Sequence, residues 1–161
     1  MQLRASRRMA GFTLVELMIV VVIATILLSI AVPSYMSQIR QSRRTEAKTA
    51  LLDLAGREES FFSTNGSLYA NTAAALGYTA MPFTTISGYY RVTVSCVAAP
   101  GAGLGCDPNA NAPAGPSYYL TATPVAGTSQ AADAQCTSFS VDSLGNQFAT
   151  GTLGAQQCWA N

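Results

Sequence analysis

The stretch that decides the fold is FTLVELMIVVVIATILLSIAV, residues 12–32, an apolar run of 21 residues with a single charge, Glu16. A helix of this length spans about 30 Å, the thickness of the hydrocarbon core of a bilayer. The eleven residues before it, MQLRASRRMAG, contain three arginines, which the positive-inside rule places in the cytoplasm. The sequence therefore predicts one membrane-crossing helix, with everything after residue 39 outside the cytoplasm.

The first residues do not resemble an ordinary secretory signal. Such a signal has an apolar part of about 7–15 residues with small residues after it, whereas here Ala10 and Gly11 precede a longer run. An acid inside a membrane helix costs about 2.5–3.5 kcal/mol. A cut after Gly11 would create a positive amine at Phe12, four residues before Glu16, and a helix N-terminus also favours a carboxylate. Glu16 thus predicts Phe12 as the mature N-terminus, its amine paired with Glu16 of the same or a neighbouring chain. The alternative is an uncut anchor with Glu16 at the cytoplasmic interface.

Pro33 follows the apolar run and predicts a helix kink. Proline lacks an N–H and clashes with the carbonyl four residues back, that of Ser29. The hydroxyls of Thr25 and Ser29 can bond to backbone carbonyls on that face. Two compatible interpretations follow: local repair of a kinked membrane helix, or a weak segment that extends when a filament is assembled or stretched.

The order Gly11-Phe12-Thr13-Leu14-Val15-Glu16, then the apolar run, then Pro33 and Tyr35, resembles the prepilin signature of type IV pilins and type II secretion pseudopilins. This resemblance implies a prepilin peptidase that cleaves after Gly11 and N-methylates Phe12. It also implies that Glu16, the fifth mature residue, sets the register between subunits. The partners it implies are other pilin subunits in a helical filament and an inner-membrane assembly platform. The subunit would move from the inner membrane into an extracellular pilus.

Downstream of Pro33, apolar residues recur at helical spacing as far as Phe62, and Asn65-Gly66 indicates the end of the helix. Short apolar pieces then connect the helix to segments that alternate as antiparallel strands do. We expect four strands, at 88–96, 117–123, 137–141 and 147–149. The fold class is therefore α+β, and the pilin resemblance implies an α/β-roll. The expected domains are a cleaved leader (1–11), a transmembrane and polymerisation helix (12–39) and a globular domain (40–161).

The globular domain is similar, more narrowly, to PilE-type minor pilins. The matching segments are Arg44-Thr45-Glu46-Ala47, Tyr119-Leu120-Thr121-Ala122-Thr123-Pro124, and the tail Asp133, Cys136, Leu144-Gly145 and Cys158-Trp159.

Four cysteines, Cys96, Cys106, Cys136 and Cys158, lie downstream of the membrane segment. An even number in this position predicts disulfides formed in an oxidising compartment. Three pairings are possible, and we favour Cys96–Cys106 and Cys136–Cys158 because each closes a short local loop. The pilin resemblance supports only the second, as the bracket of a C-terminal disulfide loop.

The chain contains no histidine, which excludes His-based metal sites, a Ser-His-Asp triad and histidine acid–base catalysis. We expect no enzyme activity, metal or cofactor. Only Arg91 among the cations lies after residue 57, so the sequence offers no clear nucleic-acid site. The predicted function is a structural subunit of a type IV pilus, minor rather than major, that supports twitching motility or adhesion.

Two alternatives remain open: a type II secretion pseudopilin, or a competence pilin for DNA uptake. Major pseudopilins generally carry an acidic calcium-binding loop near the C-terminus, whereas the tail after Gly145 contains no acid here.

Overall fold

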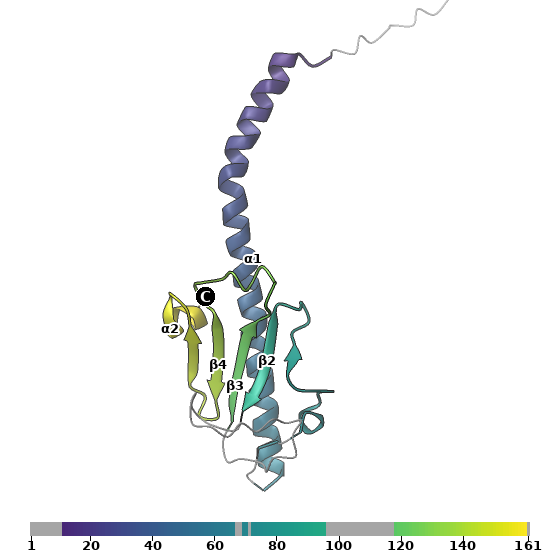
Figure 1. Cartoon of the computed structure of the whole chain (residues 1–161), viewed down its shortest axis with the longest axis vertical. Coiled ribbons are helices and arrows are strands. Elements are labelled where there is room, and N and C mark those ends of the chain that lie inside the picture. The colour runs from purple at the N-terminus through teal and green to yellow at the C-terminus, as the bar shows by residue number, and fades with distance from the viewer. Residues whose placement is uncertain (1–10, 67–68, 71, 96–117, 161) are drawn as a thin grey trace, which may run out of the picture. The chain divides into compact units, whose positions relative to one another are not determined.

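The computed structural model describes residues 11–66, 69–70, 72–95 and 118–160. The chain divides into two compact units, Met1–Gln38 and Ile39–Asn161, and the second is called the head below. Helix α1 (Leu14–Thr64) begins in the first unit and ends in the head (Figure 1). The predicted pairing Cys96–Cys106 lies outside the described residues.

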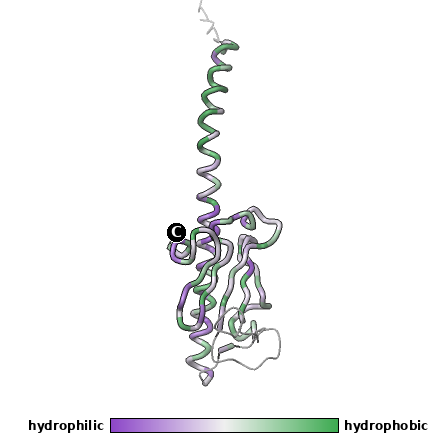
Figure 2. The backbone as a smooth tube through the Cα atoms, turned by 60° about the vertical axis from the view of Figure 1, so that its left-hand side comes forward, coloured by the Kyte–Doolittle hydropathy of each residue, from purple (hydrophilic) through white to green (hydrophobic). Residues whose placement is uncertain are grey.

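Helix α1 changes character along its length. Its N-terminal part is apolar all round, whereas its part in the head is mixed (Figure 2). Within the head its buried residues recur every three or four positions, on one face of the helix: Arg44, Ala47, Leu51, Leu54 and Glu58. The apolar spacing predicted Ala47, Leu51 and Leu54 on this face, but not the buried charged residues Arg44 and Glu58. The helix ends where Asn65-Gly66 predicted. The Asn65 side-chain amide donates to the carbonyl of Phe61 at 2.9 Å, and Gly66 takes a φ of 71° that disfavours other residues.

The head contains a five-stranded antiparallel sheet in the order β1-β2-β3-β4-β5. The strands are β1 (Phe83–Thr84), β2 (Tyr90–Ser95), β3 (Tyr119–Pro124), β4 (Ser138–Asp142) and β5 (Gln147–Thr150). The predicted number of four strands is therefore wrong by one. The missed strand, β1, has two residues, which is too short to show an alternating pattern, and it pairs only with the start of β2. A short 3₁₀-helix, η1 (Ala74–Leu76), also lies in the segment predicted as a connection.

One face of the sheet packs against α1, and the core lies between them (Figure 1). In β2 the residues Tyr90, Val92 and Val94 are buried and alternate with more exposed neighbours, as predicted. The remaining strands contribute Leu120, Ala122, Phe139 and Val141, which meet Ala47, Leu51 and Leu54 of α1. Each large aliphatic or aromatic side chain buried in this way contributes about 1.5–3 kcal/mol.

The C-terminal segment is fixed by a disulfide and a short helix. Cys136 and Cys158 are bonded, which confirms the pairing that the pilin resemblance implied. Cys158 lies in helix α2 (Gly154–Ala160), which the sequence analysis missed because seven residues of mixed composition carry little periodicity. The turn before α2 requires Gly151, since a Cβ there would lie 2.2 Å from the backbone oxygen of Gln135.

A buried ion pair joins α1 to the segment between β3 and β4. The Arg44 guanidinium donates to both carboxylate oxygens of Asp133 at 2.7 Å, and the side chains are 6% and 1% exposed. Gln135 and Gln130 complete the network: Arg44 donates to Gln135, and Gln130 donates to Asp133 and to the hydroxyl of Tyr90. Burial alone would raise the pKa of Asp133, but the hydrogen bonds and charge of Arg44 hold that pKa below its ordinary value.

We expect Asp133→Ala to destabilise the head by about 3–5 kcal/mol, because it leaves the buried Arg44 charge without an opposite charge. The matched control is Asp53→Ala, which removes the exposed pair of Asp53 with Arg57 and should cost about 1 kcal/mol or less. Denaturant unfolding of the full chain in detergent measures both. Equal losses would contradict the assignment of Asp133 as the tie between α1 and the sheet.

Candidate functional site

The first candidate site is the N-terminal part of α1. Its large apolar side chains are more than half exposed on every side of the helix: Leu14, Val15, Leu17, Met18, Ile19, Val20, Val21, Val22, Ile23, Ile26, Leu27, Leu28, Ile30 and Val32. Among the described residues, α1 is the one helix long and apolar enough to cross a membrane, judged by length and composition. A helix with apolar residues all round requires lipid or other apolar helices around it.

Phe12 and Glu16 lie four residues apart in the sequence, at the start of α1. Thr13 precedes the first helical residue, and its hydroxyl accepts a hydrogen bond from the Glu16 N–H at 3.1 Å. This is the geometry of an N-cap, and Thr13-x-x-Glu16 has the spacing of a capping box. Thr13 does not stand out in the apolar pattern, and the signal that indicates it is this Thr-x-x-Glu spacing. Within the described residues the Glu16 carboxylate forms no ion pair.

Pro33 lies inside α1, so the carbonyl of Ser29 receives no backbone N–H from that position. The hydroxyls of Thr25 and Ser29 bond to backbone carbonyls, as predicted. They reach the carbonyls of Val22 and Ile26, three residues back, at 2.8 and 2.7 Å. These bonds support the helix just before Pro33. The kink itself stays a prediction.

Cations gather at the end of the head where α1 enters it. The Arg43 guanidinium lies 3.5 Å from the centre of the Tyr89 ring and donates to Ser129 at 2.7 Å. Arg40 has a buried Nε that finds no hydrogen-bond partner among the described residues. Lys48 donates to the last carbonyls of α2, those of Cys158 and Trp159. A cation at a helix C-terminus also interacts favourably with the helix dipole.

Carboxylates gather at the opposite end of the head. Glu58 is fully buried, and one of its oxygens accepts the Ala70 N–H at 2.9 Å, while the other has no partner in the described part of the chain. Burial raises the pKa of Glu58 to about 7, against the lowering effect of the Ala70 bond. The next residue, Glu59, accepts hydrogen bonds from the hydroxyls of Tyr69 and Tyr118 at 3.0 and 3.1 Å. Burial and the charge of Glu59 raise the pKa of Tyr69 to about 12.

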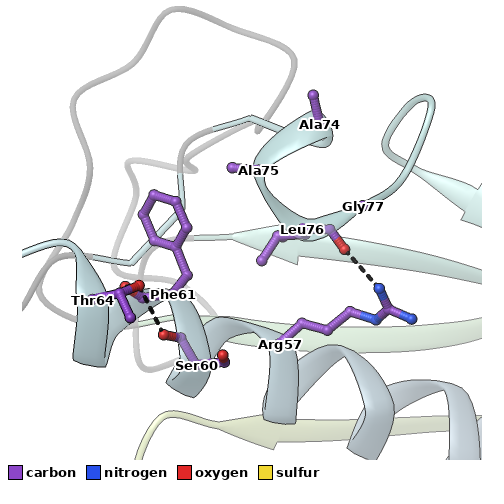
Figure 3. Close-up of a pocket in the computed structure, with 8 residues that line it drawn as sticks. All are labelled: Arg57, Ser60, Phe61, Thr64, Ala74, Ala75, Leu76 and Gly77. Carbon is purple, nitrogen blue, oxygen red and sulfur yellow. Dashed lines mark hydrogen bonds between the residues drawn. The ribbon is translucent and has the colours of Figure 1, made fainter.

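A pocket of about 400 Å³ lies between the last turns of α1 and η1 (Figure 3). Its polar groups are bonded within the chain. Arg57 donates to the carbonyl of Leu76 and to Asp53, and the Thr64 hydroxyl donates to the carbonyl of Ser60. In the described part of the chain, no group of three or more His, Cys, Asp or Glu side chains could hold a metal ion. We therefore describe this pocket as a surface depression and assign no ligand to it.

The comparisons with known proteins identify the family. A model described as type IV minor pilin ComP, DNA uptake sequence receptor, matches residues 33–140. The chain belongs to this family. A second model, the prokaryotic N-terminal methylation motif, matches residues 6–32 of the pilin, where the prepilin signature was recognised. The predicted resemblance to type IV pilins is thereby confirmed.

Two relatives and one solved structure also have names that refer to pilins or fimbriae. The pilin is 43% identical over 75 residues to the type IV major pilin protein PilA of Myxococcus xanthus, which is 47% of this chain and 34% of that protein. It is 38% identical over 89 residues to the fimbrial protein EcpC of Eikenella corrodens, which is 55% of each. The pilin thus spans about a third and about half of the two. A solved type IV pilin from Shewanella oneidensis has 24% identity and a TM-score of 0.42, over 67% of this chain and 89% of that one.

Glu58 should make the stability of the pilin depend on pH. Its pKa rises from 4.5 to about 7 in the folded state, so the folded protein binds more protons than the unfolded one between these values. Stability should therefore fall as pH rises through this window, by at most about 3 kcal/mol. Glu58→Gln should remove that fall and stabilise the pilin at pH 8.

Thermal unfolding from pH 4 to pH 8 compares this variant with the wild type. The control is Glu46→Gln, which changes a half-buried carboxylate bonded to Ser87. A wild-type slope that Glu58→Gln leaves unchanged would contradict the prediction.

Proposed function

We propose that the pilin is cleaved after Gly11, N-methylated at Phe12 and held in the inner membrane by α1 until it enters a filament. The leader then lies in the cytoplasm and the head in the periplasm. The single observation that carries this proposal is the apolar surface of α1, exposed on every side between Leu14 and Val32. Lipid can cover this surface in the membrane, and the same helix of other subunits can cover it in a pilus. The inner-membrane assembly platform would transfer the subunit between the two.

Glu16 sets the register in this proposal. Thr13 already accepts the Glu16 N–H, so the cap of α1 leaves the carboxylate available. Cleavage would supply the amine of Phe12, and N-methylation keeps its positive charge. In a filament core without water, a lone carboxylate is costly, whereas a carboxylate paired with an amine is far less so. A neighbouring helix that slides along α1 would separate the pair, and the pairing therefore selects one axial position.

We also propose that the chain is a minor rather than a major pilin of the filament. The matching family model describes a minor pilin. The pilin acts as a structural subunit and not as an enzyme, in filaments that support motility or adhesion. A pseudopilin remains less well supported, because the residues after Gly145 offer no carboxylate for calcium.

Binding of DNA is a second candidate, favoured by the description of the family model as a DNA uptake sequence receptor. In the sequence, Arg91 is the one cation after residue 57. In the structure Arg91 follows Tyr89 and Tyr90 in the chain, and Tyr89 lies against Arg43, so that cations far apart in the sequence share one end of the head. Phosphate contacts of this kind bind DNA with little regard to sequence.

The proposed maturation is tested by mass spectrometry of the chain from membranes and from sheared pili. We expect an N-terminus at Phe12 that carries one added methyl group. Glu16→Gln should leave the chain in the membrane but reduce its amount in sheared pili at least tenfold. Glu46→Gln, which changes a glutamate of the head, should assemble normally. An intact Met1 in the pilus fraction, or normal assembly of the Glu16 variant, would contradict the proposal.

The DNA candidate is tested by the salt dependence of binding to duplex DNA. The double variant Arg43→Gln/Arg91→Gln should bind several-fold more weakly and lower the slope of log affinity against log salt by about 2, one for each lost phosphate contact. Arg57→Gln, at the other end of the head, is the matched control and should bind like the wild type. Equal affinity of all three proteins would exclude this end of the head as a DNA site.

A further inference from the structure

Helix α2 and strand β5 form a second pocket, which the proposed function does not use. Strand β5 lies at one edge of the sheet, and α2 packs against it (Figure 1). The pocket between them has a volume of about 490 Å³, within the range of small-molecule sites. One lining residue comes from β5 and the others from α2: Gln147, Ala155, Gln156, Trp159 and Ala160.

The Trp159 indole is fixed in position at this pocket. Its Nε1 donates to the carbonyl of Phe148 at 2.9 Å, and its ring meets the buried ring of Phe139 edge to face, with the ring centroids 5.8 Å apart. The preceding residue, Cys158, is bonded to Cys136. Trp159 is nevertheless only half-buried. The pocket therefore offers a ligand a rigid aromatic surface, which loses little side-chain entropy on binding.

Two side-chain amides accompany the indole. Gln147 pairs with Val141, a core residue of β4, so its side chain lies on the same face of the sheet as the core. Gln156 precedes Trp159 by three residues and therefore lies on the same side of α2. Both glutamines are exposed, and neither amide forms a hydrogen bond within the described part of the chain. In the pocket beside η1, by contrast, the polar groups are bonded within the chain.

The pocket is uncharged. Its lining residues include no acid or base, and residues 146–161 contain no charged side chain. A phosphate, a carboxylate or an ammonium group would therefore find no opposite charge among the lining residues, and no charge-assisted hydrogen bond. The ligand that fits this lining is neutral, with an apolar face for the indole and with hydroxyl or amide groups for the two glutamines.

We propose that this pocket binds a neutral carbohydrate, with one sugar ring against the Trp159 indole and the sugar hydroxyls bonded to Gln147 and Gln156. The C–H groups on one face of a sugar ring are slightly positive, whereas the face of an indole is negative, so the two surfaces attract. A hydroxyl donates and accepts hydrogen bonds, as a side-chain amide does. The inference rests on the proposed function and deepens it, because it gives the adhesion a ligand class.

One pocket of this kind binds weakly. Hydrogen bonds to the sugar replace hydrogen bonds to water, so each contributes little net free energy, and we expect a dissociation constant in the millimolar range. Adhesion would then depend on several copies that engage one glycan-covered surface, since multivalent binding exceeds the affinity of a single site. Binding of a neutral sugar should not change with salt concentration, in contrast to binding of DNA.

Fluorescence of the full-length chain tests this inference, because Trp159 is the one tryptophan in the sequence. The chain is held in a zwitterionic detergent, since many other detergents have sugar head groups. The probes are lactose, maltotriose, mannotriose and triacetylchitotriose, each titrated to saturation or to the limit of its solubility. At least one of these neutral sugars should shift or quench the emission of Trp159 in a saturable manner, equally at low and high salt.

Glutamine variants identify the site. Gln147→Ala and Gln156→Ala should each weaken binding of that sugar at least threefold, because each removes hydrogen bonds to it. Gln157→Ala is the matched control, since Gln157 is the next residue of α2, is also exposed and does not line the pocket. It should bind like the wild type. All three variants should unfold at the wild-type temperature, because a purely structural role of these amides is not expected.

The outcomes separate this inference from the proposed function. A wild-type emission that none of the four sugars changes, or Gln147 and Gln156 variants that bind like the wild type, would overturn the carbohydrate site and leave the pilin function intact. A response to heparin alone would mean an anionic ligand and would also overturn it. Sugar binding by a chain that never enters pili would instead contradict the proposed function and leave the site standing.

Discussion

The structure depends on one constraint: the N-terminal part of α1 cannot remain in water. Its side chains are apolar on every side and more than half exposed, and among the described residues the buried positions of α1 begin at Arg44. Burial of such a surface contributes about 25 cal/mol for each Å² removed from water. A membrane removes it from water first, and helices of neighbouring subunits can replace the lipid. The head can then remain an ordinary soluble fold that is attached to an insoluble helix.

Several contacts fix α1 to the rest of the head, and they would hold it there after the helix has left the membrane. The apolar residues Leu51 and Leu54 anchor it to the sheet, and the bidentate pair of Arg44 with Asp133 ties it to the segment before β4. The disulfide of Cys136 with Cys158 then ties this segment to α2, whose last carbonyls receive Lys48. A load applied to α1 therefore reaches the sheet through packing, an ion pair and a covalent bond at neighbouring positions.

Much of this could be predicted from local sequence. Hydrophobic period and turn chemistry predict the apolar run, the apolar residues on the buried face of α1, the end of α1 at Asn65-Gly66 and the core residues of β2. The burial of Arg44 and Glu58 on the same face does not follow from that period. Strand β1 and helix α2 could not be predicted, because two and seven residues are too few to show a period. The pair of Arg44 with Asp133 joins residues 89 positions apart, and no local pattern reports such a contact. For the same reason the sequence does not show that Arg43 and Arg91, 48 positions apart, lie at one end of the head in the fold.

The pairing of Phe12 with Glu16 addresses one physical problem: an apolar helix surface holds subunits together without fixing their axial position. The pairing of the Phe12 amine with Glu16 is the central claim, and a high-resolution structure of the assembled filament measures it most directly. The account predicts that the Phe12 nitrogen of one subunit lies about 2.7–2.9 Å from the Glu16 carboxylate of a neighbour. A filament in which Glu16 faces water, or in which residues 1–11 still precede Phe12, would contradict it.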